Sequence, residues 1–270
     1  MKKLIYNQDD LKLYMQEYNN GLSLSKISEK YNLNRHTLAR NLKEANINIT
    51  KRKYTLNEDA FKQITSESAY WLGFIAADGC ISATGSQTEP KVLTFNLNVR
   101  DKGHLEKFKK FVSSNAIIKE QPGTGYGKGT IIAHLEINSR KMVADLQALG
   151  IEQHKSNILK PPLIEPEYHK DWIRGYIDGD GSITILSNGK AQIAVEGTKE
   201  VLTFIKTFLT PDQEKILGKR HLELNTNNYN LHYGGTNKIV ELLHKIYDDA
   251  TIYLERKYQI VLEIYSRFKK

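Results

Sequence analysis

Trp71-Leu-Gly-Phe-Ile-Ala-Ala-Asp78-Gly79 has a counterpart about a hundred residues later in the chain, Ile173-Arg-Gly-Tyr-Ile-Asp-Gly-Asp180-Gly181. Each stretch is an apolar helical run that contains a Gly, has a small residue four positions later and closes on Asp-Gly. Residues four apart lie on one face of a helix, so each helix presents small side chains along which another backbone can approach closely. The repeat therefore predicts two helices that pack against each other.

The acidic residues that close the two stretches are predicted to lie close together. Gly79 and Gly181 fit the left-handed position that commonly ends a helix, which places Asp78 and Asp180 in the final helical turns. A carboxylate is badly placed there because the C-terminal end of a helix is already partly negative. Two such acids in one small volume need a positive partner, and a divalent cation with oxygen ligands, such as Mg²⁺, meets that need.

The composition indicates a globular protein with a polyanionic partner. The 270 residues are 40% hydrophobic, enough to bury one sizeable core or two, and the net charge is +8. One cysteine, Cys80, excludes a disulfide framework and a Cys-rich zinc site. No apolar run is long enough to span a membrane and no signal-peptide pattern is found, so we expect a cytoplasmic protein without a membrane partner.

The paired stretches resemble the signature helices of LAGLIDADG homing endonucleases, in the form in which one chain carries two pseudo-symmetric repeats. The second stretch is the closer match, because the first has Ala76 where the family usually has an earlier Asp. A single Asp-Gly would be no more than a turn signal, but two matched copies favour the resemblance. The resemblance implies a site for Mg²⁺, or for Mn²⁺ or Ca²⁺ in its place, whose ligands are Asp78, Asp180 and the carbonyls of Ala77 and Gly179.

The N-terminal segment is basic and is predicted to be helical. Residues 1–53 carry eleven Lys and Arg against five Asp and Glu, a surplus of six out of the net +8. Helices are predicted over 11–18, 23–31 and 35–43, with apolar residues facing inward. This order resembles a helix-turn-helix, whose last helix reads the major groove, although a helical bundle with a solvated basic face is an alternative. The residues expected to contact DNA here are Arg35, His36, Thr37 and Arg40, followed by Lys51, Arg52 and Lys53 in a linker along the phosphates.

The stretch 92–100 alternates as a strand with one apolar and one polar face. Amide and guanidinium side chains on a sheet face can hydrogen-bond to base edges, although a merely solvated face would show the same pattern. The sheet residues expected to contact DNA are Ser82, Thr84, Thr94, Asn96, Asn98 and Arg100 in the first repeat, and Thr184, Lys190 and Gln192 in the second.

A basic residue follows the last helix of each repeat in an equivalent place. These residues are Lys155 and Lys257, with Arg256 as a possible substitute for the second. The resemblance implies that they stabilise the transition state or position water, together with the catalytic Asp78 and Asp180. Taken singly, each lysine is better explained as a solvated surface charge, and only the equivalent places of the two give the functional role the same weight.

The fold class that the resemblance implies is α+β, with two αββαββα repeats packed through the signature helices and a small all-α helix-turn-helix domain. The predicted domains are residues 1–50 (helix-turn-helix), 51–66 (basic linker), 67–160 (first repeat) and 161–270 (second repeat). A repeat of about a hundred residues suits two joined half-domains.

The predicted function is that of a monomeric, Mg²⁺-dependent endonuclease that cuts double-stranded DNA at a long, asymmetric site. It would lie with the DNA, in a nucleoid, a phage-infected cell or an organelle. The alternative is a DNA-binding regulator or an RNA-splicing maturase that has the same fold and has lost cleavage.

Overall fold

The computed structural model describes residues 6–19, 22–47, 54–83, 89–124, 128–211, 218–219 and 227–268. The chain divides into two units, Met1–Thr55 and Leu56–Lys270. Four predicted DNA contacts, Lys51, Arg52, Lys53 and Thr84, lie outside the described residues. In the described part of the chain, no helix has the length and apolar character needed to cross a membrane.

The N-terminal unit consists of three helices, α1 (Gln8–Asn19), α2 (Leu24–Lys30) and α3 (Arg35–Glu44). Side-chain caps begin the last two. The Ser23 hydroxyl accepts a hydrogen bond from the amide of Lys26, and the Asn34 side chain accepts from the amides of His36 and Thr37. Of the residues predicted to face inward, Ile27, Leu38 and Leu42 are buried in the core together with Leu11 and Tyr14, and Leu33 is partly buried against it.

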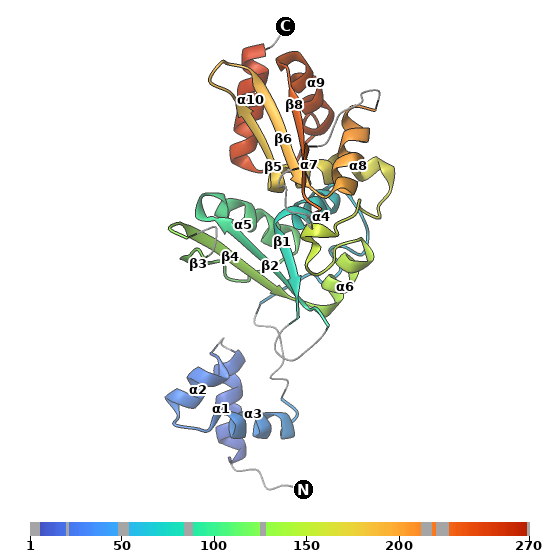
Figure 1. The fold of residues 1–270 in the computed structure, drawn as a ribbon. Helices are drawn as coiled ribbons and strands as arrows, with labels where there is room; N and C mark the ends of the chain where they lie inside the picture. The colour runs from blue at the N-terminus through green and yellow to red at the C-terminus, as the bar shows by residue number, and fades with distance from the viewer. Residues whose placement is uncertain are drawn as a thin grey trace. The chain divides into compact units, whose positions relative to one another are not determined.

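The larger unit contains two repeats that share the order helix, two strands, helix, two strands, helix, and the second repeat has one additional helix at its end (Figure 1). The first comprises α4 (Ser66–Asp78), β1 (Gly79–Ser82), β2 (Val92–Asn98), the short helix η1 (Val99–Asp101), α5 (Lys102–Phe111), β3 (Lys119–Pro122), β4 (Ile131–Asn138) and α6 (Arg140–Ala148). The second comprises α7 (His169–Asp180), β5 (Gly181–Ile185), β6 (Ala191–Gly197), α8 (Lys199–Leu209), β7 (Gly218–Lys219), β8 (Tyr229–Gly234), α9 (Thr236–Tyr247) and α10 (Glu255–Phe268). The short helices η3 (Lys155–Asn157) and η4 (Pro166–Tyr168) lie in the connection between them. The predicted α+β class and its two repeats are confirmed.

Each repeat forms a four-stranded antiparallel sheet, with strand orders β1-β2-β4-β3 and β5-β6-β8-β7. The alternation predicted in β2 is confirmed, because Leu93, Phe95 and Leu97 are buried while Asn96 is exposed. Helices cover one face of each sheet (Figure 1). Along the strands, the side chains that alternate with the buried ones are half-buried or exposed, so the other face of each sheet is the polar one.

The two signature helices, α4 and α7, pack against each other as predicted and lie between the sheets (Figure 1). Their glycines permit the close approach. A Cβ atom on Gly73 would lie 2.0 Å from the carbonyl oxygen of Trp172, and one on Gly175 would lie 1.9 Å from that of Tyr70. No side chain larger than hydrogen fits at either position, so the repeat-to-repeat interface depends on both glycines.

The prediction that Gly79 and Gly181 adopt left-handed conformations is wrong. Both are extended, with φ of −76° and −91°, because each passes directly from its helix into a strand. A Cβ atom at these positions would lie 2.8 Å and 2.5 Å from the carbonyl oxygens of Ile75 and Ile177. The need for glycine therefore comes from crowding by the preceding helical turn.

Two smaller predictions also need correction. Arg100 is not on the sheet, because Asn98 ends β2 by accepting a hydrogen bond from the Arg100 amide and begins η1. The linker predicted over 51–66 ends early, since residues from Leu56 onward belong to the larger unit and the buried Phe61 packs against Phe111.

Candidate active site

The C-terminal ends of α4 and α7 meet, as the sequence predicts. A Cβ atom built on Gly179 would lie 2.3 Å from the Cβ of Ala77 and 3.4 Å from a carboxylate oxygen of Asp78. Asp78 and Asp180 are the last residues of the two helices, and both are exposed. Two carboxylates and two negative helix ends therefore share one junction that is open to solvent.

The pKa of Asp78 is raised to about 6. Loss of hydration in the crowded junction is the first cause and the Asp180 carboxylate the second, although the Asp78 side chain still reaches solvent. The ammonium groups of Lys257 and Lys155 act in the opposite direction. The junction thus disfavours a second negative charge, and a bound cation would relieve the repulsion.

Lys155 reaches the junction from the connection between the repeats. Its Nζ donates a hydrogen bond of 2.9 Å to the carbonyl of Ala77, the end of α4. Burial lowers the pKa of Lys155, while the carboxylates of Asp180 and Asp78 oppose that shift. His154, in a left-handed conformation with φ of 52°, turns the chain so that Lys155 begins η3.

Lys257, the equivalent residue of the second repeat, lies at the start of α10 and is buried. Its Nζ lies 2.8, 2.6, 3.2 and 2.5 Å from the carbonyl oxygens of Ile177, Asp178, Gly179 and Gly181. Burial lowers its pKa to about 8. The two lysines are therefore brought to the same junction, but Lys257 takes the form of a cap on the C-terminal end of α7.

Asp178, the earlier acid of the second stretch, is buried away from the junction. Its carboxylate accepts hydrogen bonds from the hydroxyls of Tyr70 and Tyr247 and from the amide of Leu254, at 2.6–2.7 Å. Burial raises its pKa despite these donors. Ala76, at the corresponding place in the first stretch, is also buried. The acid that the first stretch lacks therefore corresponds to a buried residue with a structural role. The exposed acids at the helix ends, Asp78 and Asp180, are present in both stretches.

The donor atoms at the junction suit a hard cation. They are carboxylate oxygens from Asp78 and Asp180 and carbonyl oxygens from Ala77 and Gly179, the oxygen ligands that Mg²⁺ and Ca²⁺ take. The described residues contain no group of three or more His, Cys, Asp or Glu side chains around one point. A cation here would therefore complete its shell with backbone oxygens, water or a substrate.

Comparison with known proteins gives distant structural matches. No protein-family model and no curated protein matches the sequence. Solved structures that resemble the chain include LAGLIDADG endonucleases. The homing endonuclease I-WcaI, bound to its DNA recognition sequence, is 18% identical over 75% of this chain and 91% of its own, with a TM-score of 0.49.

Two further matches are similar in extent. The LAGLIDADG meganuclease I-AabMI, bound to uncleaved DNA, is 13% identical over 76% of this chain and 90% of its own, with a TM-score of 0.49. The LAGLIDADG homing endonuclease I-LtrWI, bound to target DNA, is 12% identical over 76% and 92%, with a TM-score of 0.46. These likenesses are too distant to assign a role to any residue of this chain.

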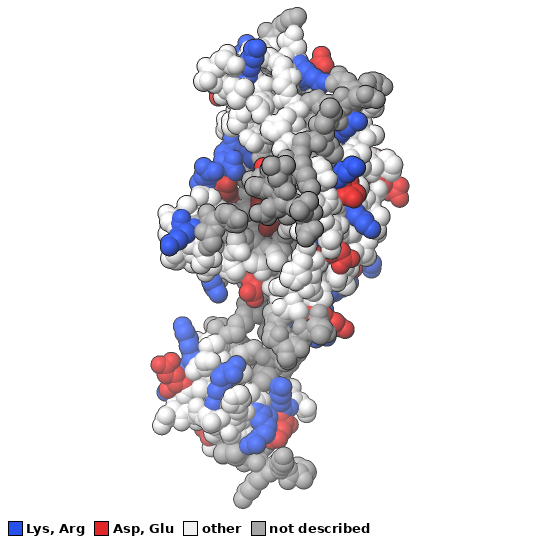
Figure 2. Space-filling model, in the orientation of Figure 1, with Lys and Arg blue, Asp and Glu red and all other residues white. Residues whose placement is uncertain are grey.

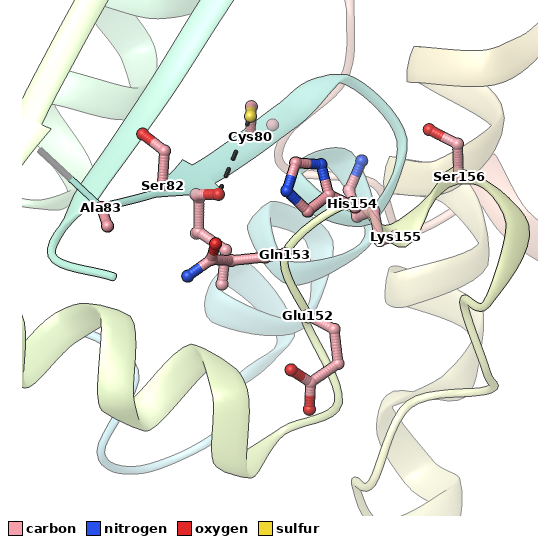
Figure 3. Close-up of a pocket in the computed structure, with 10 residues that line it drawn as sticks. Cys80, Ser82, Ala83, Glu152, Gln153, His154, Lys155 and Ser156 are labelled. Atoms are coloured by element: carbon pink, nitrogen blue, oxygen red, sulfur yellow. Dashed lines mark hydrogen bonds between the residues drawn. The ribbon is translucent and has the colours of Figure 1, made fainter. Parts of the chain in front are cut away.

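Two cavities adjoin the junction, and Lys155 lines both. The first, of about 520 Å³, lies between β1 and the segment Glu152–Ser156, with Cys80 and Ser82 on one side and His154 and Lys155 on the other (Figure 3). The second, of about 230 Å³, brings Lys155 together with Asp180. Lys155 thus stands where a bound ligand would contact the carboxylates and the first sheet.

The polar sheet faces carry most of the DNA contacts that were predicted on the two sheets. Those in described strands are the half-buried Ser82, Thr94, Asn98, Thr184 and Gln192 and the exposed Asn96. Lys190 is exposed in the turn before β6, and Arg100 is exposed in η1.

Two histidines on these faces were missed by the sequence analysis. The Asn96 side chain and His134 Nδ1 are 2.8 Å apart on the first sheet, and the Gln192 side chain and His232 Nδ1 are 3.2 Å apart on the second. Alternation along 131–138 could have revealed His134, since its neighbours Ala133 and Leu135 are buried. The partner of each amide could not be foreseen, because it depends on strand register.

On α3 of the N-terminal unit, Arg35, His36 and Arg40 are exposed and Thr37 is half-buried. Figure 2 shows Lys and Arg side chains over this unit with acidic side chains between them. The predicted reading helix therefore presents its side chains to solvent, and its contact with DNA remains a prediction.

Proposed function

We propose that this chain is a Mg²⁺-dependent endonuclease that cuts both strands of DNA at a long, asymmetric site and acts as a monomer. The observation that carries the proposal is the meeting of Asp78 and Asp180 at the joined ends of α4 and α7, with Lys155 beside them. The two polar sheet faces flank this junction and offer amide, hydroxyl and imidazole groups for base edges.

Asp78 and Asp180, with the carbonyls of Ala77 and Gly179, would hold the metal ions. When bound, these ions would supply an activated water and neutralise the charge that develops on the leaving oxygen. Each carboxylate would serve one strand. In the reaction, a water oxygen bonds to phosphorus and releases a proton, one bridging P–O bond breaks, and the departing sugar oxygen takes up a proton.

The N-terminal unit would add contacts outside the cleavage core through α3. Replacing Arg35 and Arg40 together with Ala should weaken binding and reduce the slope of log K against log salt by roughly two, since about one counterion is released per phosphate contact. The matched control is Lys12→Ala, whose side chain lies beside Asp9 on α1. Binding titrations at several salt concentrations measure this, and equal slopes for all three proteins would contradict a role of α3 in binding.

A protein that binds DNA or RNA on this fold without cutting it is the second candidate function. One observation favours it: the ammonium groups of Lys155 and Lys257 donate to the same Ala77 and Gly179 carbonyls that a metal would use. A positive charge at these oxygens competes with a cation for them.

Selection for cleaved molecules from a random duplex library, in Mg²⁺, distinguishes the two candidates. We expect one enriched sequence cut on both strands. Asp78→Asn and Asp180→Asn should bind that sequence with nearly unchanged affinity and lose at least about a thousandfold in double-strand cleavage, because each removes a metal ligand. Specific binding without cleavage by the wild-type protein would favour the second candidate.

A further inference from the structure

The two equivalent lysines differ in how many hydrogen-bond acceptors they meet. The Lys257 ammonium lies within 3.2 Å of four carbonyl oxygens at the end of α7. Among the residues that the structure describes, the Lys155 ammonium donates to one carbonyl oxygen, that of Ala77. Because an ammonium group has three N–H donors, Lys257 has none to spare, whereas Lys155 has two that it can turn towards a ligand.

The Lys155 side chain is also more exposed than that of Lys257. Lys257 is 3% exposed and is enclosed by the end of α7 and the start of α10. Lys155 is half-buried, lines both cavities at the junction and lies beside β1 (Figure 3). A phosphate entering the junction can therefore contact Lys155 with little rearrangement, whereas contact with Lys257 would uncap α7.

The segments that carry the lysines cross between the repeats. The Leu159 carbonyl accepts a 2.6 Å hydrogen bond from the Thr198 hydroxyl at the N-terminus of α8, so the Lys155 segment is fixed to the second repeat. Arg256 forms a 3.0 Å ion pair with Asp101, so the segment of Lys257 is fixed to the first.

The crossing places Lys155 beside the acid of the other repeat. Lys155 and Asp180 line the same cavity, and the described lining of that cavity includes neither Asp78 nor Lys257. Lys257 is held instead by the carbonyl oxygens at the end of α7. The half of the junction around Asp180 thus has a cation with donors to spare.

We propose that Lys155 contacts the scissile phosphate while Lys257 is a fixed cap of α7, so that the strand served by Asp180 is cut before the strand served by Asp78. The order of cutting rests on the proposed nuclease function, whereas the division of roles between the lysines does not. Lys155 would donate a hydrogen bond to an oxygen that gains negative charge as the P–O bond breaks. Double-strand cleavage would therefore pass through a nicked intermediate.

Two measurements without cleavage test the division of roles. Labelling the folded, metal-free protein with an amine reagent, followed by peptide mass spectrometry, should modify Lys155 and spare Lys257. Duplex DNA should then protect Lys155. In thermal unfolding, Lys257→Met should lower Tm by roughly 5–10 °C, because it leaves buried carbonyls without donors, while Lys155→Met should change Tm by less than about 2 °C.

The third measurement follows each strand of a labelled target in Mg²⁺. The wild-type protein should accumulate nicked product, with one strand always cut first. Lys155→Met should slow that first cut by about a hundredfold, the usual loss for one donor to a developing charge, and Lys155→Arg should recover part of the rate. Lys257→Arg is the matched change at the other position and should lower Tm, since a guanidinium does not fit among the four carbonyls.

The possible results distinguish three claims: the division of roles between the lysines, the order of cutting and the nuclease function. Equal labelling of both lysines, or a Tm loss for Lys155→Met as large as for Lys257→Met, would overturn the division of roles. Simultaneous cutting of both strands, or an unchanged first cut in Lys155→Met, would overturn the order while the nuclease function stands. A wild-type protein that cuts neither strand would overturn the nuclease function and the order together, and labelling and Tm would still decide the roles.

Discussion

The two repeats have the same order of elements but fill their cores with different chemistry. Beside α4, the first repeat buries an aromatic cluster in which the ring of Phe108 lies 5.0 Å from that of Trp71 and 4.9 Å from that of Phe95. Such ring pairs add about 0.5–1.5 kcal/mol each beyond the area that they bury. This core tolerates changes of shape poorly and needs no charged group.

The second repeat instead buries a charged network on α7. Arg174, which is 2% exposed, donates to the carbonyls of Ile246 and Ile252 at 3.0 Å and to Asp171 at 2.7 Å. Leu72 occupies the equivalent position in the first stretch. The comparison shows that one backbone arrangement accommodates apolar packing or a satisfied polar network.

The two repeats also differ at the junction, where Lys257 caps a helix and Lys155 keeps hydrogen-bond donors for a ligand. Pseudo-symmetry of the backbone therefore does not make the two halves chemically equivalent. Each difference between the repeats can be tested by changing one member of a matched pair of residues.

The largest effect on stability is expected from Arg174→Leu, which gives the second repeat the residue type of the first. Removing one partner of a buried ion pair leaves Asp171 and two carbonyls unsatisfied, and should reduce the free energy of unfolding by about 3–5 kcal/mol. Leu72→Met, the matched change in the first repeat, should cost less than about 1.5 kcal/mol. Urea unfolding measures both, and similar losses for the two variants would show that the cores do not differ in this way.

Alanine at the helix-packing glycines should affect both repeats alike. Gly73→Ala and Gly175→Ala each place a methyl group about 2 Å from a carbonyl oxygen of the opposite helix, and each should cost roughly 3 kcal/mol or more because the backbones must separate. Gly103→Ala is the control, since no atom lies within 4 Å of the added Cβ. It should stabilise α5 by about 0.5–1 kcal/mol. A loss at only one of the two interface glycines would contradict equal approach of α4 and α7.

The two sheet faces should differ in how strictly they read DNA. The first presents Thr94 and Asn96, whereas Ala194 and Glu196 in the second offer apolar contact and a carboxylate. We expect mismatches in the half-site under the first sheet to cost about 1–3 kcal/mol each, and those under the second to cost less. Cleavage of every single-base variant of the target measures this, and a tolerance profile symmetric about the cut would refute it.

Asp78→Asn should stabilise the metal-free protein, and the effect should depend on pH. The pKa of Asp78 is raised to about 6 in the folded protein, above its ordinary value of 3.8, so the wild-type protein loses stability as pH rises from about 4 through 6. The advantage of Asn should be greatest above pH 7, shrink between pH 6 and 4 and vanish below. Asp180→Asn should act in the same direction, since it relieves the same repulsion.

Urea unfolding in a chelator across this pH range measures the effect, and added Mg²⁺ should reverse the ranking by stabilising the wild-type protein. A difference between wild type and Asp78→Asn that stays constant with pH would mean that the two carboxylates do not repel each other.

Local patterns in the sequence determined the elements and the identity of the central pair of helices. The spacing of Gly73 from Ala77, that of Gly175 from Gly179 and the alternation along β2 are short-range signals, because each depends on residues only a few positions apart. The placement of Asp78 and Asp180 at helix ends follows from the same kind of signal.

Contacts between distant residues were decided only by the tertiary structure. Lys155 and Lys257 occupy equivalent places in the sequence, yet one meets a single carbonyl and the other meets four. The pairing of Asn96 with His134 depends on strand register, and the role of Asp178 depends on Tyr70, Tyr247 and Leu254. Burial and hydrogen bonding arise from atoms far apart along the chain, so periodicity and spacing locate the charged residues of this junction but do not say which of them remain available to a ligand.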